Sequence, residues 1–239
     1  MTEAVYHTDA YAREADGRVT AITDEGGIAV DRSVFYPTSG GQPGDSGRLV
    51  WADGSIDIAT TVKGEGGAIV LVPAEPSALP PVGTQVTQQL AWDRRHRLMR
   101  VHTALHLLSV VVPLPVTGGS ISTDKGRLDF NMPEAPESKA AIEDELNRLI
   151  ACNFDVRSEW ITDAELDANP ALVKTMSVQP PRGSGRIRLI RIGNREGAVD
   201  LQPCGGTHVD NTSQIGQIRI GKIEKKGKQN RRVYMHLVS

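Results

Sequence analysis

The chain has 239 residues, a formal net charge of −2 and only two cysteines, so it is long enough to bury a core without disulfide bonds. Apolar residues make up 39% and charged residues 23%, which excludes a disordered or fibrous chain. Two cysteines exclude a disulfide framework, and the acidic N-terminus lacks the apolar core of a signal peptide. The most apolar stretch, 105–116, is too short to span a bilayer. We expect a soluble cytoplasmic protein of one large or two small domains.

Charge is distributed unevenly along the chain. Residues 182–239 contain 12 of the 27 lysines and arginines but only 4 of the 29 acidic residues, so this segment carries +8. Residues 1–181 carry −10. This asymmetry predicts a basic face for a polyanion on an acidic body, with a merely solvated lysine-rich hairpin as the alternative.

The first 90 residues are predicted to form a small β-barrel or sandwich. Short runs containing valine and isoleucine are cut at close intervals by glycine, proline, aspartate and asparagine. The expected strands cover 17–23, 27–36, 55–63, 68–73 and 84–90.

The pattern changes at Trp92, and residues 91–239 are predicted to form a second, α+β domain. Asp93 is a suitable N-cap for a first helix, whose apolar residues recur at helical spacing until Pro113. A second amphipathic helix is expected over 137–151.

A short third helix and three strands complete this second domain. Thr162 and Glu165 form a capping-box pattern that opens the helix, and Pro170 should end it. Alternating apolar residues predict strands over 186–192, 217–224 and 231–238.

Two short motifs carry candidate metal ligands. His102 and His106 are four residues apart, so on a helix both project from one face. Cys204 and His208 enclose two glycines, which allow the backbone to fold tightly enough for both side chains to converge. Together they form a His₃Cys set suited to one zinc ion per chain. Thr103 stands where a zinc peptidase helix of the H-E-x-x-H type has glutamate, which argues against peptidase chemistry.

The number of ligands leaves the function of the zinc open. Four protein ligands are typical of a closed, structural site, whereas catalysis requires an open coordination position. A loose ligand or an expanded coordination shell would still permit catalysis.

Three segments of the chain read His-Thr-Ala-Leu-His-Leu-Leu from residue 102, Arg-Leu-Asp-Phe from 127 and Gln-Pro-Cys-Gly-Gly-Thr-His-Val from 202. These segments resemble one family, the AlaX-type trans-editing proteins, which are free-standing relatives of the alanyl-tRNA synthetase editing domain. The resemblance also covers 35–45 and 222–232, and so extends over nearly the whole chain.

The resemblance implies a translation-factor-like β-barrel over 1–90, followed by an α/β zinc-containing aminoacyl-tRNA editing domain over 91–239. It implies hydrolysis of the ester bond in Ser-tRNA(Ala), and also of that in Gly-tRNA(Ala). Since no aminoacylation core precedes the motifs, ligase activity is not expected. The alternative hypothesis is a non-catalytic tRNA-binding module in which zinc only stabilises the fold.

One position departs from the family pattern. Many alanyl editing domains have threonine where this chain has Leu105, so a hydroxyl near the metal is missing. Either Thr103, Ser120 or Ser122 recognises the serine side chain, or the chain deacylates another mischarged tRNA. Segment 117–123 is the candidate for the other wall of the pocket, or else a Gly/Ser turn.

The remaining candidate residues fall into three groups. The catalytic candidates are Thr103 and the backbone N–H groups of Gly205 and Gly206, which are candidate oxyanion donors. Arg127 and Asp129 are expected to form a structural ion pair. The resemblance implies that Gly40 and Gly41 face the substrate, against the alternative of a tight hairpin turn. With them, the substrate-binding candidates are Ser39, Gly40, Gly41, Gln42, Ser120 and Ser122.

Basic residues cluster in two places, and phosphate contacts there would give salt-dependent affinity for tRNA. One cluster opens the first helix and the other lies on the last hairpin. The tRNA-binding candidates are Arg94, Arg95, Arg97, Lys225, Lys226, Lys228, Arg231 and Arg232.

Overall fold

The computed structural model describes residues 1–176, 185–194 and 197–238. The chain divides into two compact units, Met1–His96 and Arg97–Ser239, and the division falls within helix α1 (Trp92–Val111). The expected boundary, between residues 90 and 91, lies just before this helix. No helix in the described ranges combines the length and the apolar content that a membrane crossing requires.

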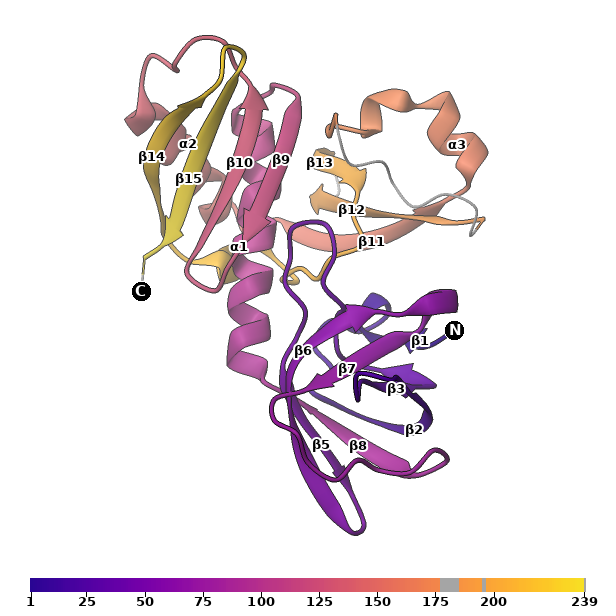
Figure 1. Cartoon of the computed structure of the whole chain (residues 1–239). Helices are drawn as coiled ribbons and strands as arrows, with labels where there is room; N and C mark the ends of the chain where they lie inside the picture. The colour runs from indigo at the N-terminus through magenta and orange to yellow at the C-terminus, as the bar shows by residue number, and fades with distance from the viewer. Residues whose placement is uncertain (177–184, 195–196, 239) are drawn as a thin grey trace. The chain divides into compact units, whose positions relative to one another are not determined.

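The first unit is a closed six-stranded barrel with strand order β2-β3-β7-β6-β5-β8 (Figure 1). Two short strands, β1 (Glu3–Ala4) and β4 (Arg32–Ser33), pair in parallel beside it. The barrel strands are β2 (Glu14–Ile22), β3 (Ile28–Val30), β5 (Gly47–Trp51), β6 (Gly54–Lys63), β7 (Ile69–Pro73) and β8 (Gln85–Leu90). The barrel is confirmed, although β5 was not among the expected strands, and 27–36 forms two short strands rather than one.

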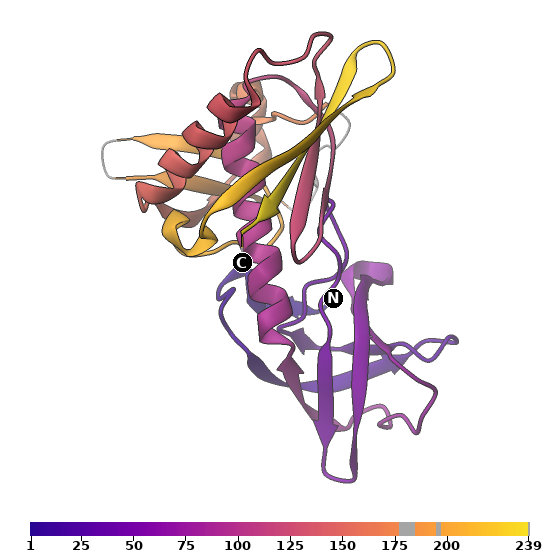
Figure 2. The same ribbon diagram turned by 90° about the vertical axis from the view of Figure 1, so that its left-hand side faces the viewer.

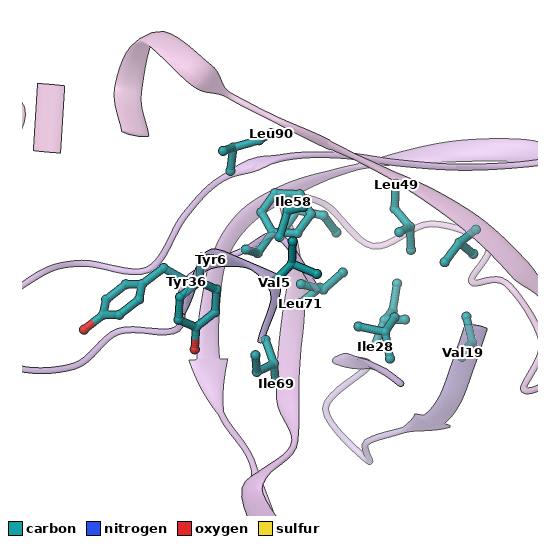
Figure 3. Close-up of a cluster of buried hydrophobic side chains, with 14 of the residues drawn as sticks. Val5, Tyr6, Val19, Ile28, Tyr36, Leu49, Ile58, Ile69, Leu71 and Leu90 are labelled. Carbon is teal, nitrogen blue, oxygen red and sulfur yellow. The ribbon is translucent and has the colours of Figure 1, made fainter. Parts of the chain in front are cut away.

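Alternating apolar residues of the strands fill the barrel interior. In β6, Ile56 and Ile58 are buried while Asp57 between them is exposed, as the two-residue period of a strand requires. Figure 3 shows the labelled residues of this core, among them Leu49 and Leu71, both fully buried. Each such side chain stabilises the fold by about 1.5–3 kcal/mol.

A buried ion pair connects the start of α1 to the barrel. The Arg95 guanidinium donates to Asp45 from Nε (2.8 Å) and also from Nη2, and to the Val34 carbonyl at 2.7 Å. Asp45 accepts a further hydrogen bond from the Tyr36 N–H at 2.6 Å. The expectation that Arg95 binds tRNA is therefore corrected, because its side chain is fully buried among partners of its own unit.

We predict that Asp45→Ala lowers the free energy of unfolding by about 3–5 kcal/mol, because it leaves the Arg95 charge buried and unpaired. The measurement is urea-induced unfolding followed by circular dichroism. Asp57→Ala is the matched control, since Asp57 is 76% exposed in its pair with Arg48 and its loss should cost within about 0.5 kcal/mol. Equal losses for the two variants would contradict the prediction.

In the second unit, α1 passes between two antiparallel sheets (Figures 1 and 2). The four-stranded sheet has the order β14-β15-β10-β9 and the three-stranded sheet the order β11-β12-β13. The strands are β9 (Val116–Ile121), β10 (Lys125–Asn131), β11 (Asp155–Ile161), β12 (Ile187–Gly193), β13 (Ala198–Pro203), β14 (Ile218–Lys226) and β15 (Asn230–Leu237). The other helices are α2 (Lys139–Ala151) and α3 (Asp163–Ala168). Strands and helices are mixed, which confirms the α+β class.

Residues 101–109 of α1 are all buried, as expected of a helix that is covered on both sides. On the side of β10, Gly126 permits a close approach, since a Cβ there would lie 2.7 Å from Val101 and 3.0 Å from Leu105. On the side of β13, His106 contacts Asp200. The helix is thereby held between the two sheets.

The helix termini follow the expected chemistry with two differences. Thr162 and Glu165 form the predicted capping box of α3, which is confirmed. The cap of α2 is Ser138, whose Oγ accepts from the Ala141 N–H at 3.1 Å, so this helix begins two residues later than expected. Asp93 lies inside the first turn of α1 rather than at its N-cap, since the helix begins at Trp92.

Candidate metal centre

The four candidate ligands converge in the second unit. His102 and His106 project from one face of α1, and each is only 7% exposed. Cys204 and His208 belong to the loop that follows β13. The Cys204 Sγ lies 3.4 Å from Nε2 of His102 and 3.3 Å from Nε2 of His208. One ligand atom from each of the four residues lies within 4.8 Å of the others, so the cluster could hold a metal ion.

The spacing and chemistry of these atoms fit zinc. A tetrahedral zinc ion with Zn–N of about 2.0–2.1 Å and Zn–S of about 2.3 Å places nitrogen and sulfur about 3.5 Å apart. The two observed sulfur–nitrogen distances, 3.4 and 3.3 Å, are close to this value. Three imidazoles and one thiolate are also a ligand set that zinc favours over magnesium or calcium.

Asp200 orients His106 from outside the cluster. Its Oδ2 accepts from Nδ1–H of His106 at 2.9 Å and from Nε2 of Gln202 at 2.8 Å, and its Oδ1 pairs with Lys174. A proton on Nδ1 leaves Nε2 of His106 as the metal-binding atom, which is the usual effect of a carboxylate behind a histidine ligand. Neither Asp200 nor Lys174 was predicted from the sequence motifs.

The sequence contains a signal that could have identified Asp200. Asp200, Gln202 and Cys204 alternate at a spacing of two, and a strand directs such residues to one face. The structure shows β13 extending to Pro203, with the first two of these side chains directed to α1 and the third at the cluster.

Thr103 orients His208. Its hydroxyl donates to the Met99 carbonyl at 3.0 Å, and its oxygen faces Nδ1 of His208 at 3.1 Å. The same oxygen accepts from the Val209 N–H at 3.3 Å. A proton on Nδ1 leaves Nε2 of His208 directed at the cluster. The expectation that Thr103 is catalytic is corrected, because its hydroxyl lies on the opposite side of the His208 ring from Cys204.

Arg188 of β12 holds the cysteine loop in place. Its Nη1 donates to the carbonyls of Cys204 at 3.1 Å and of Gly206 at 2.8 Å, and its own carbonyl accepts from the Cys204 N–H at 3.0 Å. The Gly206 N–H is directed at the Cys204 Sγ, 3.4 Å away. The expectation that the Gly206 N–H stabilises an oxyanion is therefore corrected, because this N–H donates to the Cys204 sulfur. Gly205 is exposed on the same loop.

The charges of the site favour a bound cation. Burial alone would raise the pKa of the Cys204 thiol. The neighbouring His102 and His208 outweigh this effect and bring the pKa well below its usual value. Burial lowers the pKa of His106, yet its hydrogen bonds to Asp200 and Cys204 raise it overall to about 9. Burial raises the pKa of Asp200, which His106 and Lys174 bring down to about 2. The protein therefore stabilises positive charge between the thiolate and the carboxylate.

Ser120 and Ser122, two of the residues expected to recognise a serine hydroxyl, do not lie at the ligands. Leu105 packs against Gly126 on β10 and is 4% exposed. Ser120 of β9 is paired with Arg127 of β10. Both lie on the face of the sheet opposite to the buried Gly126, which faces α1. The Ser122 hydroxyl donates to the Lys125 carbonyl at 2.9 Å and closes the turn between β9 and β10. Segment 117–123 is therefore an edge strand and a turn, which corrects its assignment to the pocket wall.

Residues 39–42 form a tight turn in the first unit. Ser39 and Gln42 exchange two backbone hydrogen bonds, of 3.1 and 2.9 Å. Gly40 and Gly41 have φ angles of +56° and +83°, a conformation that glycine adopts without strain. The side chain of Gln42 is fully buried, so it anchors the turn, and its expected contact with substrate is corrected. The two glycines are exposed.

The basic candidates differ in how far their charges are already paired. Arg127 and Arg232 both bind Asp129, each at 2.8 Å, so the predicted structural pair is confirmed and the Arg232 charge is shared with it. Lys226 pairs with Glu224, while Lys225 and Lys228 are exposed at the tip of the β14–β15 hairpin.

The other arginines contact their own units. Arg94 donates to the Gly44 carbonyl at 2.8 Å, and Arg231 to the Pro133 carbonyl at 2.9 Å. Arg97 is exposed and pairs with Asp124.

Residues 187–234 match the protein family described as the threonyl and alanyl tRNA synthetase second additional domain. Over its full length the chain is 33% identical to the alanyl-tRNA editing protein AlaX-M of Methanosarcina acetivorans, and the alignment covers 100% of both chains. The AlaX-M protein of Methanosarcina barkeri is 35% identical over 100% of both chains. The AlaX-M protein of Saccharolobus solfataricus is 35% identical over 98% of both. The similarity thus spans both units.

We predict that Asp200→Ala weakens zinc binding by about 10- to 100-fold, because His106 loses the partner that fixes its ring. Competition with a chromogenic chelator measures the affinity. Asp200→Asn retains an acceptor for Nδ1–H and should lose less, while Asp167→Ala, exposed on α3, should match the unchanged protein. An unaltered affinity in Asp200→Ala would count against this orientation of His106.

Proposed function

Because the chain belongs to the family of AlaX-type alanyl-tRNA editing proteins, we propose that it hydrolyses Ser-tRNA(Ala), and also Gly-tRNA(Ala), as a zinc-dependent trans-editing deacylase. The observation that supports this proposal is the convergence of His102, His106, Cys204 and His208, from segments about a hundred residues apart, on one possible metal site.

The proposed reaction is the attack of water on the ester that links the amino acid to the terminal ribose. Zinc, when bound, supplies a Lewis acid for the ester carbonyl or lowers the pKa of water. The protein itself contributes the orientation of the ligands, since Asp200 and Thr103 fix the tautomers of His106 and His208. Arg188 and the Gly206 N–H hold the Cys204 loop and its sulfur in place.

The proposed selectivity follows from the limits of amino-acid recognition. A pocket for alanine rejects serine, which only adds a hydroxyl, by about 10²-fold. A second site that binds the serine hydroxyl discriminates by about 10⁴-fold, because alanine leaves a buried polar group without its partner. The group that binds this hydroxyl is not Leu105, whose side chain packs on β10. We retain Gly40, Gly41 and Ser39 as proposed substrate contacts, and Gly205 as a proposed oxyanion donor.

A second candidate function is a tRNA-binding module with a structural zinc. It is favoured by the completeness of the ligand set, since four protein ligands are typical of structural sites. The direction of the Gly206 N–H, toward the sulfur rather than a substrate, also fits it. Release of free serine from preformed Ser-tRNA(Ala), compared with Ala-tRNA(Ala) and repeated with a chelator, separates the two functions.

We predict that Cys204→Ala and His106→Ala each lose bound zinc and abolish the release of serine from Ser-tRNA(Ala). Both substitutions remove a ligand from the same site, so zinc content and turnover should fall together. Zinc is measured by atomic emission and turnover by deacylation of radiolabelled Ser-tRNA(Ala). Turnover near that of the unchanged protein without bound zinc would rule out the zinc-dependent mechanism, and zinc-bound protein that is inactive would favour the binding module.

The basic residues are proposed to bind the phosphates of the acceptor stem, and we predict that Lys225→Glu with Lys228→Glu raises KM more than it lowers kcat. Each lost phosphate contact should reduce the salt dependence of binding by about one unit of log–log slope. Steady-state deacylation at several salt concentrations measures both effects. Lys63→Glu with Arg48→Glu, at exposed barrel positions, changes the net charge equally and is the control. The same KM increase in this control would show a general charge effect instead of a binding surface.

A further inference from the structure

Three residues form one row across the three-stranded sheet, and one of them is a metal ligand candidate. Trp160 on β11 is paired directly with Arg188 on β12. Cys204 directly follows the last residue of β13 and continues the pairing of β13 with β12, since its N–H donates to the Arg188 carbonyl at 3.0 Å. Directly opposed residues of antiparallel strands place their side chains on the same face. Trp160, Arg188 and Cys204 therefore lie side by side on the face that carries the cluster.

The position of Trp160 can be estimated from the sheet itself. Neighbouring strands are about 4.8 Å apart, so Trp160 lies two strands, or about 10 Å, from Cys204 along the sheet. The opposite face of the sheet carries a hydrophobic cluster with Leu166, Ile187 and Leu189 at its centre. Trp160 therefore lies on the face of the sheet that carries the candidate metal ligand, and not on the face that carries this hydrophobic core.

Trp160 is also exposed to a degree unusual for its size. Its relative exposure is 47%, whereas the other two tryptophans, Trp51 and Trp92, pack against the barrel core. The adjacent Arg188 is only 9% exposed, because its guanidinium is bound to the cysteine loop. A half-exposed indole thus lies beside a hydrogen-bonded row that ends at the candidate metal ligand.

We propose that Trp160 is a stacking platform for the terminal nucleobase of the RNA whose ester is presented at the metal centre. This inference rests on the proposed function, because it takes the ester as the group positioned beside Cys204. One ribose separates that ester from the base, so the base lies within about the width of two strands from the metal site. Trp160 occupies this distance on the same face.

The chemistry of the neighbourhood suits a nucleotide. Base–aromatic stacking tolerates any base, since every base has a flat π face, so Trp160 would register the presence of a terminal base rather than its identity. Arg186 is exposed directly before β12 and adds positive charge next to this row for the adjoining phosphate. The platform would position the acceptor end and leave the bond-breaking step to other groups.

The test compares two uncharged acceptor-stem hairpins, one ending in CCA and one lacking the terminal adenosine. Phosphate contacts are common to both RNAs, so the ratio of their Kd values isolates the contribution of the last base. We expect the unchanged protein to bind the CCA hairpin about 5- to 100-fold more tightly, the range that stacking on an aromatic residue provides. Trp160→Ala should bind the two equally, and Trp160→Phe should retain most of the difference.

Val238→Ala is the matched control, because Val238 is 43% exposed in the same unit and should leave the ratio unchanged. Circular dichroism and zinc content verify that Trp160→Ala is folded. An unaltered ratio in Trp160→Ala, or equal binding of both RNAs by the unchanged protein, would overturn the proposal. A changed oligomeric state with an unaltered ratio would assign Trp160 to a protein contact instead.

The outcome is separable from the fate of the proposed function. If the unchanged protein releases no serine from Ser-tRNA(Ala), the deacylase proposal fails, yet the uncharged hairpins still report whether Trp160 stacks the last base. If serine is released and the Kd ratio is insensitive to Trp160, the stacking proposal fails alone. Where both hold, Trp160→Ala should also raise KM for deacylation by a factor similar to its loss in Kd.

Discussion

A helix that is buried along its middle and yet carries polar side chains is the constraint on which the second unit depends. Residues 101–109 of α1 are all shielded from water, and this stretch contains His102, Thr103, His106 and Ser109. Such groups are costly to bury unless each has a partner. Their partners come from the helix itself, from β13 and from the loop after it. The same contacts that build the metal site therefore allow α1 to lie between two sheets.

The order of charges through the site extends this constraint. Lys174, the Asp200 carboxylate, the His106 imidazole and the Cys204 thiolate follow one another from the partly exposed lysine to the cluster. Lys174 is partly exposed, whereas Asp200 is fully buried. A cation among the ligands lies next to the thiolate and close to the carboxylate behind His106, and both of these negative groups favour positive charge nearby. The electrostatic preference for a metal is thus built from residues on three separate segments.

The features that could be predicted from the sequence are those with local or periodic causes. The ligand pairs were recognisable because a helix and a glycine-rich loop each impose a spacing, and the α3 cap because Thr162 and Glu165 act on neighbouring N–H groups. The glycine-rich segment 117–123 was assigned to a pocket wall or a turn, and not to a strand, because nothing in its own residues shows that β10 pairs with it. Arg95 and Arg97 look equivalent in the sequence, and only the folded first unit shows that Arg95 is buried against Asp45 and Val34.

The contact between Gly126 and Leu105 has a consequence for how sequences of this fold can diverge. Leu105 fills the space that the missing side chain at 126 leaves on β10, with its methyl groups 3.0 and 3.1 Å from where a Cβ would stand. The volume available at position 105 is therefore set by its partner on the strand. A smaller residue at 105 would open a void that a larger residue at 126 could refill, so substitutions at these two positions should be coupled. Where the two volumes do not match, the imidazole of His106, the next residue in the helix, would be displaced.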